Sequence, residues 1–320
     1  MQSIQTLIQS NFEQVDLVIN EQLTSDVPLV EQISEYIVQS GGKRLRPVLV
    51  LLSCGLLNNV DDKSARLAAA IEFLHTATLL HDDVVDTSDM RRGKSTANHK
   101  WGNAPSVLVG DFLYARSFEL LVSLRNMDVM ECLSQATRII AEGEVMQLTN
   151  IGNVNLTQAQ YYEVIYAKTA KLFEASCVSA AMLNNASSKQ IEALIEYGKQ
   201  LGLAFQLVDD VLDYCGDAAV MGKNVGDDLA EGKATLPLIY CLANAKDDEK
   251  KIIKRAIINE GLDELAAILE IIKNTGAIEY SIKQAKLAGD KASAALDCFD
   301  DNEYKTALLR LINVAIDRVS

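Results

Sequence analysis

The sequence predicts an all-α protein with a single domain, residues 1–320, built as a bundle of long antiparallel helices. Three observations predict this. The chain has only four prolines and none between Pro105 and Pro237, so long stretches contain nothing that must end a helix. Apolar residues recur at helical spacing, and no sustained strand alternation is evident. No internal repeat, low-complexity tract or long linker divides the chain.

The charge balance excludes one large class of function. With 44 acidic and 30 basic residues the formal net charge is −14, whereas proteins that grip nucleic acid cluster Lys and Arg on one surface. No nucleic-acid partner is therefore expected, and any anionic ligand must be met by local cations.

The cysteines and the N-terminal residues predict a cytoplasmic protein. The six cysteines are widely separated and form no C-x-x-C pair, which favours neither a zinc site nor a disulfide framework. No Lys or Arg precedes Lys43, so the basic start of a secretory or organelle signal is missing. The longest apolar run, "PVLVLLSCGLL" from Pro47, is too short for a transmembrane segment.

Helices are expected in the stretches between five breaks that are rich in Gly, Asn, Asp and Ser. In the segment that leads to Asp82, for example, Leu67, Ala70, Ile71 and Leu74 share one helical side. The last third of the chain alternates short amphipathic segments with charge runs, which are typical of solvated helix faces. The breaks, interpreted as loops, are 40–47, 58–64, 91–105, 149–157 and 215–235.

The stretch "LLHDDVVDTSDMRRG" places Asp82, Asp83 and Asp86 directly behind a run typical of a buried helix. Residues four apart share a helix face, so Asp82 and Asp86 point the same way, and like charges at this spacing cost about 0.2–0.5 kcal/mol even in water. A cation should offset them. One D-D-x-x-D by itself also fits an acidic helix end that faces solvent.

A second stretch, "FQLVDDVLDY", repeats the spacing at Asp209, Asp210 and Asp213 inside another apolar helix. Asp209 and Asp213 again share a face. Two such carboxylate walls facing one another across a cleft carry too much charge to stand without a metal. The repeat therefore favours a functional site over a solvated surface.

Magnesium is the ion that these residues predict. All the candidate ligands are hard oxygens, no His or Cys accompanies them at zinc spacing, and Mg²⁺ is usually held by one or two carboxylates together with substrate phosphates. The predicted magnesium site therefore also predicts a phosphorylated substrate. A third acidic group, Asp227, Asp228 and Glu231 in "GDDLAEG", lies in a stretch flanked by glycines and is not predicted to be a metal wall.

Basic residues cluster near the motifs in this acidic chain. The guanidinium group of Arg can bind a phosphate through two parallel hydrogen bonds. A solvated surface position remains the alternative for any one of these residues. The basic residues concerned are Lys43, Arg44, Arg46, Arg91, Arg92, Lys94, Lys168, Lys171, Lys223 and Lys233.

The segments "GGKRLRP", "FLHTATLLHDDVVDTSDMRRG", "GEVMQL", "KTAKLFEA", "FQLVDDVLDY" and "GKNVGDDLAEGKATLPL" occur in this order. Together they resemble the trans-polyprenyl diphosphate synthase family, with its two aspartate-rich motifs, over nearly the whole chain. The resemblance implies the isoprenoid synthase fold, in which helices surround a central catalytic cavity. It also implies a homodimer and a prenyltransferase that makes a long, octaprenyl, product for ubiquinone or another respiratory quinone.

The resemblance gives each motif residue a role. Asp82, Asp86 and Asp209 are implied to hold Mg²⁺, three ions per site with substrate bound, and these ions bridge the diphosphate of an allylic substrate such as farnesyl diphosphate. The residues implied to support them are Asp83, Asp210 and Asp213. The residues implied to contact the allylic diphosphate are Arg91, Lys168, Thr169, Gln206, Lys223 and Lys233.

A second set is implied to bind isopentenyl diphosphate, namely Lys43, Arg46, His75 and Arg92. A lone His on a helix is more often a satisfied core residue, but His75 lies two turns before Asp82 on the same face. With the resemblance, this position favours a hydrogen bond to the diphosphate.

Four further polar residues are given lesser roles. His81 and His99 are expected to be structural. Glu144 and Gln147 are expected to lie behind the residues that contact the diphosphate.

Product length is expected to depend on the residues just before the first motif. Ala77 and Thr78 lie about one turn deeper than Asp82 and are small. In the family that the chain resembles, an aromatic residue near this point stops elongation early, so the two small residues imply an open passage. The alternative is that they only let two helices pack closely. A floor is expected further down, among Phe118, Leu121 and Leu133.

The expected reaction is ionisation of the allylic diphosphate and attack on the cation by the double bond of isopentenyl diphosphate, with Mg²⁺ as Lewis acid. No protein nucleophile is needed, and no Ser/His/Asp or Cys/His arrangement is evident. The alternatives are a shorter-chain farnesyl or geranylgeranyl diphosphate synthase, a class I terpene cyclase, and a non-catalytic synthase subunit. A cyclase binds one diphosphate, whereas "GGKRLRP" and "RRG" indicate a second diphosphate site.

Overall fold

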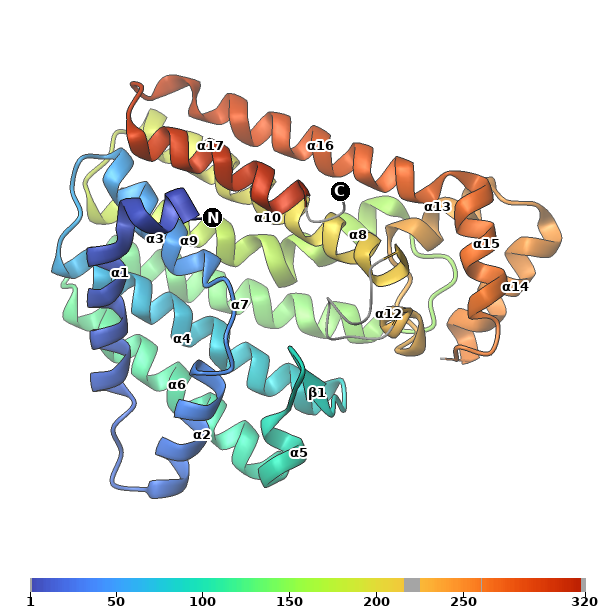
Figure 1. The fold of residues 1–320 in the computed structure, drawn as a ribbon, viewed down its shortest axis with the longest axis horizontal. Helices are drawn as coiled ribbons and strands as arrows, with labels where there is room; N and C mark the ends of the chain where they lie inside the picture. Colours follow the sequence, from blue (N-terminus) through green and yellow to red (C-terminus); the bar gives the residue numbers. More distant parts are fainter. Residues whose placement is uncertain (1, 216–224, 260, 318–320) are drawn as a thin grey trace. The chain divides into compact units, whose positions relative to one another are not determined.

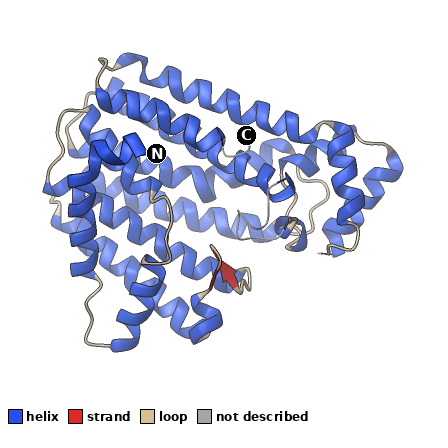
Figure 2. Cartoon of the chain, viewed as in Figure 1, coloured by secondary structure: helices blue, strands red, loops and turns tan. Residues whose placement is uncertain are grey.

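The structure is a computed structural model and describes residues 2–215, 225–259 and 261–317. Helices make up nearly all of it, and the described residues contain one two-stranded hairpin, drawn in red in Figure 2. The prediction of an all-α protein is confirmed. The chain divides into two compact units, and each is described by itself.

Unit 1 contains the N-terminal helices together with later returns of the chain. It comprises the residues up to Thr137, then Leu172–Gly198 and Ala295–Leu311. Its elements (Figure 1) are α1 (Gln2–Gln22), α2 (Pro28–Val38), α3 (Leu45–Leu56), α4 (Asp62–Val85), β1 (Met90–Arg91), β2 (Lys94–Ser95), α5 (Ala97–Trp101), α6 (Asn103–Ser123), the first part of α7 (Met127–Thr149), nearly all of α9 (Lys171–Leu183), the first part of α10 (Ser188–Cys215), the short 3₁₀ helix Leu296–Cys298 and most of α17 (Glu303–Ile316).

Unit 2 comprises Arg138–Lys171, Lys199–Ala294 and the residues from Ile312 onward. It therefore holds the remaining parts of α7, α10 and α17. Its own elements are α8 (Gln158–Ile165), one turn of π-helix (Tyr166–Ala170), α12 (Asp227–Ala230), α13 (Leu236–Asn244), α14 (Asp247–Asn259), α15 (Leu265–Thr275) and α16 (Ala277–Ala295).

Each of the four prolines lies within the first three residues of a helix. Pro28 begins α2, Pro47 is the third residue of α3, Pro105 the third of α6 and Pro237 the second of α13. A proline costs little there, because the first backbone N–H groups of a helix have no partner inside it. The prolines therefore start helices here and interrupt none of them.

Helix α4 carries the first aspartate motif and is buried on nearly every side. It packs against α1, α3 and α6, and residues from Ser64 to Asp83 are buried on all of its faces. Its start is fixed by a capping box, in which Asp61 accepts from the backbone N–H of Ser64 at 3.0 Å. A helix that is apolar all round is a core helix. The three acids of the first motif therefore lie at the end of a helix that is packed on all sides.

The segment 91–105, interpreted from the sequence as a loop, contains defined structure. Met90 pairs with Ser95 and Arg91 with Lys94, and the turn residues Arg92 and Gly93 have φ of 51° and 74°. Two consecutive positive φ values are typical of a type I′ turn, whose twist matches that of a hairpin. The hairpin and α5 therefore form here, and α6 begins before the segment ends.

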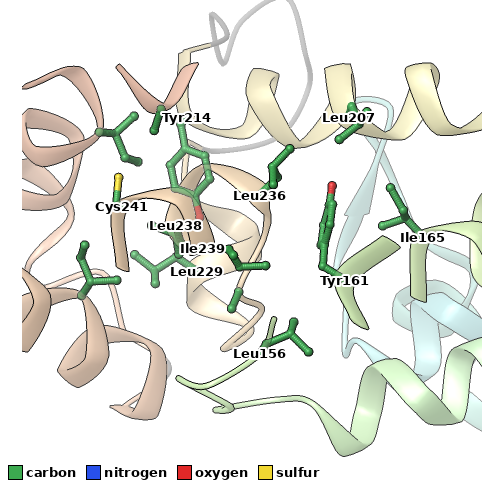
Figure 3. Close-up of a cluster of buried hydrophobic side chains, with 14 of the residues drawn as sticks. Leu156, Tyr161, Ile165, Leu207, Tyr214, Leu229, Leu236, Leu238, Ile239 and Cys241 are labelled. Atoms are coloured by element: carbon green, nitrogen blue, oxygen red, sulfur yellow. The ribbon is translucent and has the colours of Figure 1, made fainter. Parts of the chain in front are cut away.

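The core of unit 2 is a cluster of apolar side chains from α8, α10 and the helices after α12. Figure 3 shows Tyr161 in it, with its hydroxyl directed toward the helix that carries Leu207. Tyr240 and Tyr280 stack at 4.3 Å at the margin of the cluster, and the Tyr280 hydroxyl donates to Gln158 at 2.9 Å. This core holds α8 and the second half of α10 together.

Within the described ranges, no helix combines the length and the apolar character needed to cross a membrane. All six cysteines are free thiols, three of them buried. The prediction of a single domain stays a prediction.

Gly110 on α6 leaves room for the ring of His81, because a Cβ at position 110 would overlap that ring. Gly110→Ala should therefore lower the free energy of unfolding by about 1 kcal/mol, because overpacking outweighs the gain in helix propensity. The change is measured by urea denaturation. In a His81→Ala background the same substitution should cost much less. An equal cost in both backgrounds would show that the His81 ring is not what constrains position 110.

Candidate active site

The predicted site residues fall into two groups, one in each unit. Lys223 lies outside the described residues. Unit 1 holds Lys43, Arg46, His75, Ala77, Thr78, Asp82, Asp83, Asp86, Arg91, Arg92, Leu121 and Leu133, and unit 2 holds Lys168, Thr169, Gln206, Asp209, Asp210, Asp213 and Lys233. That the two aspartate motifs face one another stays a prediction.

The first aspartate motif forms the last turn of α4, with Asp86 as the residue that ends the helix. Asp82 and Asp86 are half-buried, and Asp83 is completely buried. Arg91 from β1 meets Asp83, with its Nε and one terminal nitrogen each 2.7 Å from Oδ1. Burial raises the pKa of Asp83, and the charge and hydrogen bond of Arg91 oppose that rise. Asp83, the middle acid, thus binds the hairpin to α4 through Arg91. A contact of Arg91 with the allylic diphosphate stays a prediction.

Asn98 on α5 holds the turn that follows the motif, a role that was not predicted from the sequence. Its amide donates to the backbone carbonyls of Asp83 at 3.0 Å and Ser88 at 3.2 Å. Thr96 also donates to the carbonyl of Ser88, at 2.7 Å. The bond to Asp83 satisfies a carbonyl in the last turn of α4, where carbonyls have no partner inside the helix. The bonds to Ser88 hold the turn that follows the helix.

Three of the four residues implied to bind isopentenyl diphosphate, Arg46, His75 and Arg92, act on one another electrostatically. Lys43 is exposed, and its place in this group stays a prediction. The guanidinium of Arg46 lies 4.7 Å from the ring centroid of Phe173, and burial lowers its pKa to about 10. The pKa of His75 is well below its ordinary value, first through burial and then through the charges of Arg46, Arg92 and Arg91. His75 is therefore neutral at pH 7 and has one ring N–H to donate.

Glu72 lies in this cation group and was not predicted. It is one turn before His75 on α4 and only 9% exposed. Burial raises its pKa, and the charges of Arg46, Arg44 and Arg92 lower it. A buried acid beside mutually repelling arginines compensates part of their charge. The only available signal was the polar residue in an otherwise apolar stretch, "AAAIEFLH".

The residues expected to control product length lie within unit 1. Ala77 has no exposed surface and Thr78 is half-buried, with its hydroxyl donating to the carbonyl of His75 at 2.8 Å. Leu121 and Leu133 are buried. Thr78 is thus the better placed of the two small residues to line a passage, and the roles of all four stay predictions.

The second aspartate motif lies on α10, and its three acids differ in exposure. Asp209 is half-buried, while Asp210 and Asp213 are 2% and 6% exposed. Asp210 accepts hydrogen bonds from Gln206 Nε2 at 2.7 Å and from the hydroxyl of Tyr161. Burial, and then the charge of Asp228, raises the pKa of Asp210 to about 8. Asp210, the middle acid of this motif, is thus also buried, and it binds α8 to α10 through Tyr161.

Lys168 and Thr169 lie on the π-helical turn Tyr166–Ala170, which the sequence did not predict. The ammonium of Lys168 lies 2.6 Å from both Glu144 Oε2 and Gln147 Oε1. Glu144 and Gln147 therefore hold the Lys168 ammonium, and a contact of Lys168 with a diphosphate stays a prediction. Their helix approaches closely because residue 143 is glycine, and a Cβ there would lie 2.7 Å from the backbone nitrogen of Lys168.

Asp228 lies beside the second motif, although "GDDLAEG" was not expected to contribute to a metal site. It lines the same hollow as Lys168, Gln206, Asp210 and Lys233, and its charge acts on Asp210. The segment is also partly helical, as α12. Sequence spacing gave no indication of this placement because it depends on how the chain returns to α10.

The donor set fits magnesium that is shared with a substrate. Among the described residues no group of three or more His, Cys, Asp or Glu side chains converges on one metal position. Asp82 and Asp209 are half-buried, with carboxylates that are partly accessible. Few protein ligands and free coordination positions for phosphate oxygens are typical of Mg²⁺ sites.

Comparison with known proteins identifies the family. The polyprenyl synthetase family model matches residues 27–273. The chain belongs to the polyprenyl synthetase family. Two of its relatives in the family are the octaprenyl diphosphate synthase of Escherichia coli, 44% identical over 99% of both chains, and an all-trans-nonaprenyl-diphosphate synthase (geranyl-diphosphate specific) of Rhodobacter capsulatus, 43% identical over 99% of this chain and 98% of that one.

Solved structures of the polyprenyl synthetase family share this fold. A polyprenyl synthase from Caulobacter crescentus CB15, complexed with calcium and isoprenyl diphosphate, superposes with a TM-score of 0.96 at 44% identity, over 100% of this chain and 98% of that chain. The predicted family and the all-α fold of isoprenoid synthases are thereby confirmed.

From the raised pKa of Asp210 we predict how the free energy of unfolding depends on pH. An unfolded Asp titrates at about 4, whereas Asp210 in the folded chain titrates at about 8. Its stabilising contribution is therefore complete below about pH 4 and is lost as the pH rises through about 8. Asp210→Asn cannot ionise, so its urea midpoint in EDTA should fall less than that of the wild type between about pH 5 and 9. Parallel curves would mean that Asp210 is ionised in the folded chain throughout.

Proposed function

We propose that the chain is an octaprenyl diphosphate synthase, which adds isopentenyl diphosphate repeatedly to an allylic diphosphate such as farnesyl diphosphate. One observation carries the proposal beyond family membership. The chain has two separate places suited to a diphosphate, the Arg46, His75 and Arg92 group in unit 1 and the Lys168 and Thr169 region in unit 2. A condensation of two diphosphates needs both, whereas a terpene cyclase needs one.

Asp82, Asp86 and Asp209 would hold Mg²⁺ in this proposal, with Asp83, Asp210 and Asp213 fixing the helices that carry them. The metal supplies Lewis-acid stabilisation of charge on the departing diphosphate. The relative from Caulobacter crescentus binds calcium, another divalent ion with a preference for oxygen ligands, together with isoprenyl diphosphate. That complex supports a site of this chemistry on the present chain.

The protein residues bind, orient and exclude water. Lys43, Arg46 and Arg92 neutralise the isopentenyl diphosphate, and neutral His75 donates its ring N–H to a phosphate oxygen. The apolar body of α4 shields the reacting carbons, because water would trap a carbocation. The C–O bond of the allylic substrate breaks, the new C–C bond forms, and the proton lost from the condensed chain passes to the released diphosphate. No side chain is required as a nucleophile.

The proposed product length is supported by the relatives and by the small residues before the first motif. The relatives include enzymes named for octaprenyl and for nonaprenyl products at nearly equal identity. The octaprenyl product, its use in a quinone side chain, a cytoplasmic location and a homodimer are parts of the proposal. So are the use of magnesium as the ion and three ions per site.

The proposal is tested by incubating the purified chain with Mg²⁺, farnesyl diphosphate and isopentenyl diphosphate and separating the products by chromatography. Asp82→Ala and Asp209→Ala should stay folded and helical but lose activity by about 100-fold or more, because a charge-stabilising ligand is removed. Near-normal turnover by either variant would contradict the metal assignment. Product from farnesyl diphosphate alone would favour a cyclase, and an inactive wild-type chain would favour a non-catalytic subunit.

Product length gives a separate prediction. Thr78→Tyr should place a ring where a growing chain passes and shift the product from octaprenyl toward geranylgeranyl length, with the first condensation largely retained. Ala77→Tyr should have the same effect if that residue also lines the passage, although a ring at this fully buried position also strains the core. Unchanged product length in an active Thr78→Tyr enzyme would contradict the open passage. A wild-type product of farnesyl or geranylgeranyl length would contradict the octaprenyl assignment.

A further inference from the structure

A chain of side-chain hydrogen bonds runs through unit 2 from the π-helical turn to α8. The hydroxyl of Thr169 donates to Gln206 Oε1 at 2.9 Å, and Gln206 Nε2 donates to Asp210 Oδ1 at 2.7 Å. The hydroxyl of Tyr161 donates to the other carboxylate oxygen, Oδ2. Four residues on three elements are therefore linked through one buried carboxyl group.

The two ends of this chain differ in their surroundings. All four residues line a hollow of about 70 Å³, but Tyr161 and Asp210 are only 3% and 2% exposed, whereas Thr169 and Gln206 are half-buried. Lys168 lines the same hollow. The more accessible end, at Thr169 and Gln206, is where the proposed function places the allylic diphosphate.

The hydroxyl of Tyr161 is not needed to fill the core. Apolar neighbours surround its ring, among them Ile165 and Leu207 (Figure 3), and a phenylalanine would bury nearly the same surface. A buried hydroxyl costs free energy unless it is bonded. Burial and the nearby charge of Asp210 raise the pKa of Tyr161 well above its ordinary value, so it remains a proton donor.

The bond to Tyr161 restricts the remaining links. With both of its oxygens engaged, the Asp210 carboxyl group has one preferred orientation, and Gln206 must turn its NH₂ group toward it. The amide oxygen of Gln206 then faces Thr169, and its second N–H is available to an anion. Without the bond to Tyr161, the Asp210 carboxyl group could rotate, and the Gln206 amide could then exchange the positions of its oxygen and its NH₂ group.

We propose that Tyr161 is a positioning residue for the allylic substrate, acting through Asp210 and Gln206 to fix the donors offered to its diphosphate. This inference rests on the proposed function, since Thr169 and Gln206 are assigned there to that diphosphate. It goes beyond that function because Tyr161 itself touches neither substrate nor metal in the proposal.

Tyr161→Phe removes only the hydroxyl. Binding of farnesyl thiolodiphosphate, an unreactive analogue of farnesyl diphosphate, with Mg²⁺ is measured by calorimetry, and folding is checked by circular dichroism. We expect the Kd to rise about 3- to 10-fold, the loss of one well-placed hydrogen bond. The KM for isopentenyl diphosphate should change by less than about twofold, because that site lies in other residues.

Tyr162→Phe is the matched control. Tyr162 is the next residue on the same helix, half-buried, and its hydroxyl bonds to Gln158 instead of Asp210. Its removal should leave the Kd of the analogue unchanged. An equal rise in both variants would attribute the effect to general loosening of α8 and overturn the proposal.

A double-mutant cycle tests the route of the effect. In an Asp210→Asn background, Tyr161→Phe should add less than about twofold to the Kd, because the link through which it acts is already altered. A full additional effect would overturn a role through Asp210. If Tyr161→Phe does not fold, Asp210→Asn by itself alters the same chain one link further on, and an unchanged Kd in that variant overturns the proposal.

The outcomes separate this inference from the proposed function. A wild-type chain that does not bind the analogue contradicts the substrate assignment itself. A wild-type chain that binds it, with Tyr161→Phe binding equally well, contradicts only the role of Tyr161.

Discussion

Carboxylates buried in apolar helices are the constraint on which the site depends. A carboxyl group in a protein core is costly unless other groups of the fold form hydrogen bonds with it. Arg91 bonds one oxygen of Asp83, and Tyr161 and Gln206 bond the two oxygens of Asp210. The bonds of Arg91 and Tyr161 each fasten a second element to the helix that carries the motif. The hairpin in unit 1 and α8 in unit 2 are held in this way.

Three of the outer acids are more accessible than the middle acids, and the proposed function assigns the metal to these three. Asp82, Asp86 and Asp209 are half-buried, so a metal can reach them without unpacking either helix. In a chain of net charge −14 the cations must be gathered locally, and Arg46 and Arg92 do this in unit 1. Burial and these charges keep His75 neutral, which leaves it a donor and avoids adding another positive charge to the group.

Glycine at two positions allows the close approaches that the site needs. Gly110 leaves space for the ring of His81 beside the first motif, and Gly143 lets α7 approach the π-helical turn so that Glu144 and Gln147 reach Lys168. A π-turn inside a helix carries an extra residue and is found mostly where function requires it. Here it presents Lys168 and Thr169 on adjoining positions, the lysine bound to α7 and the threonine to Gln206 on α10.

The sequence alone determined the helical class, the two motifs, most of the cations and the family, because these depend on composition and on spacing along one helix. It did not determine what holds those residues in place. Tyr161 and Asp210 are 49 positions apart. Asn98 had no local signal, and the local patterns around Glu72 and Asp228 did not indicate which residues they would meet. The turn at Arg92 and Gly93 was missed because arginine seldom adopts a positive φ. Only the tertiary structure decided these contacts, since burial makes a bonding partner necessary and packing selects which distant residue supplies it.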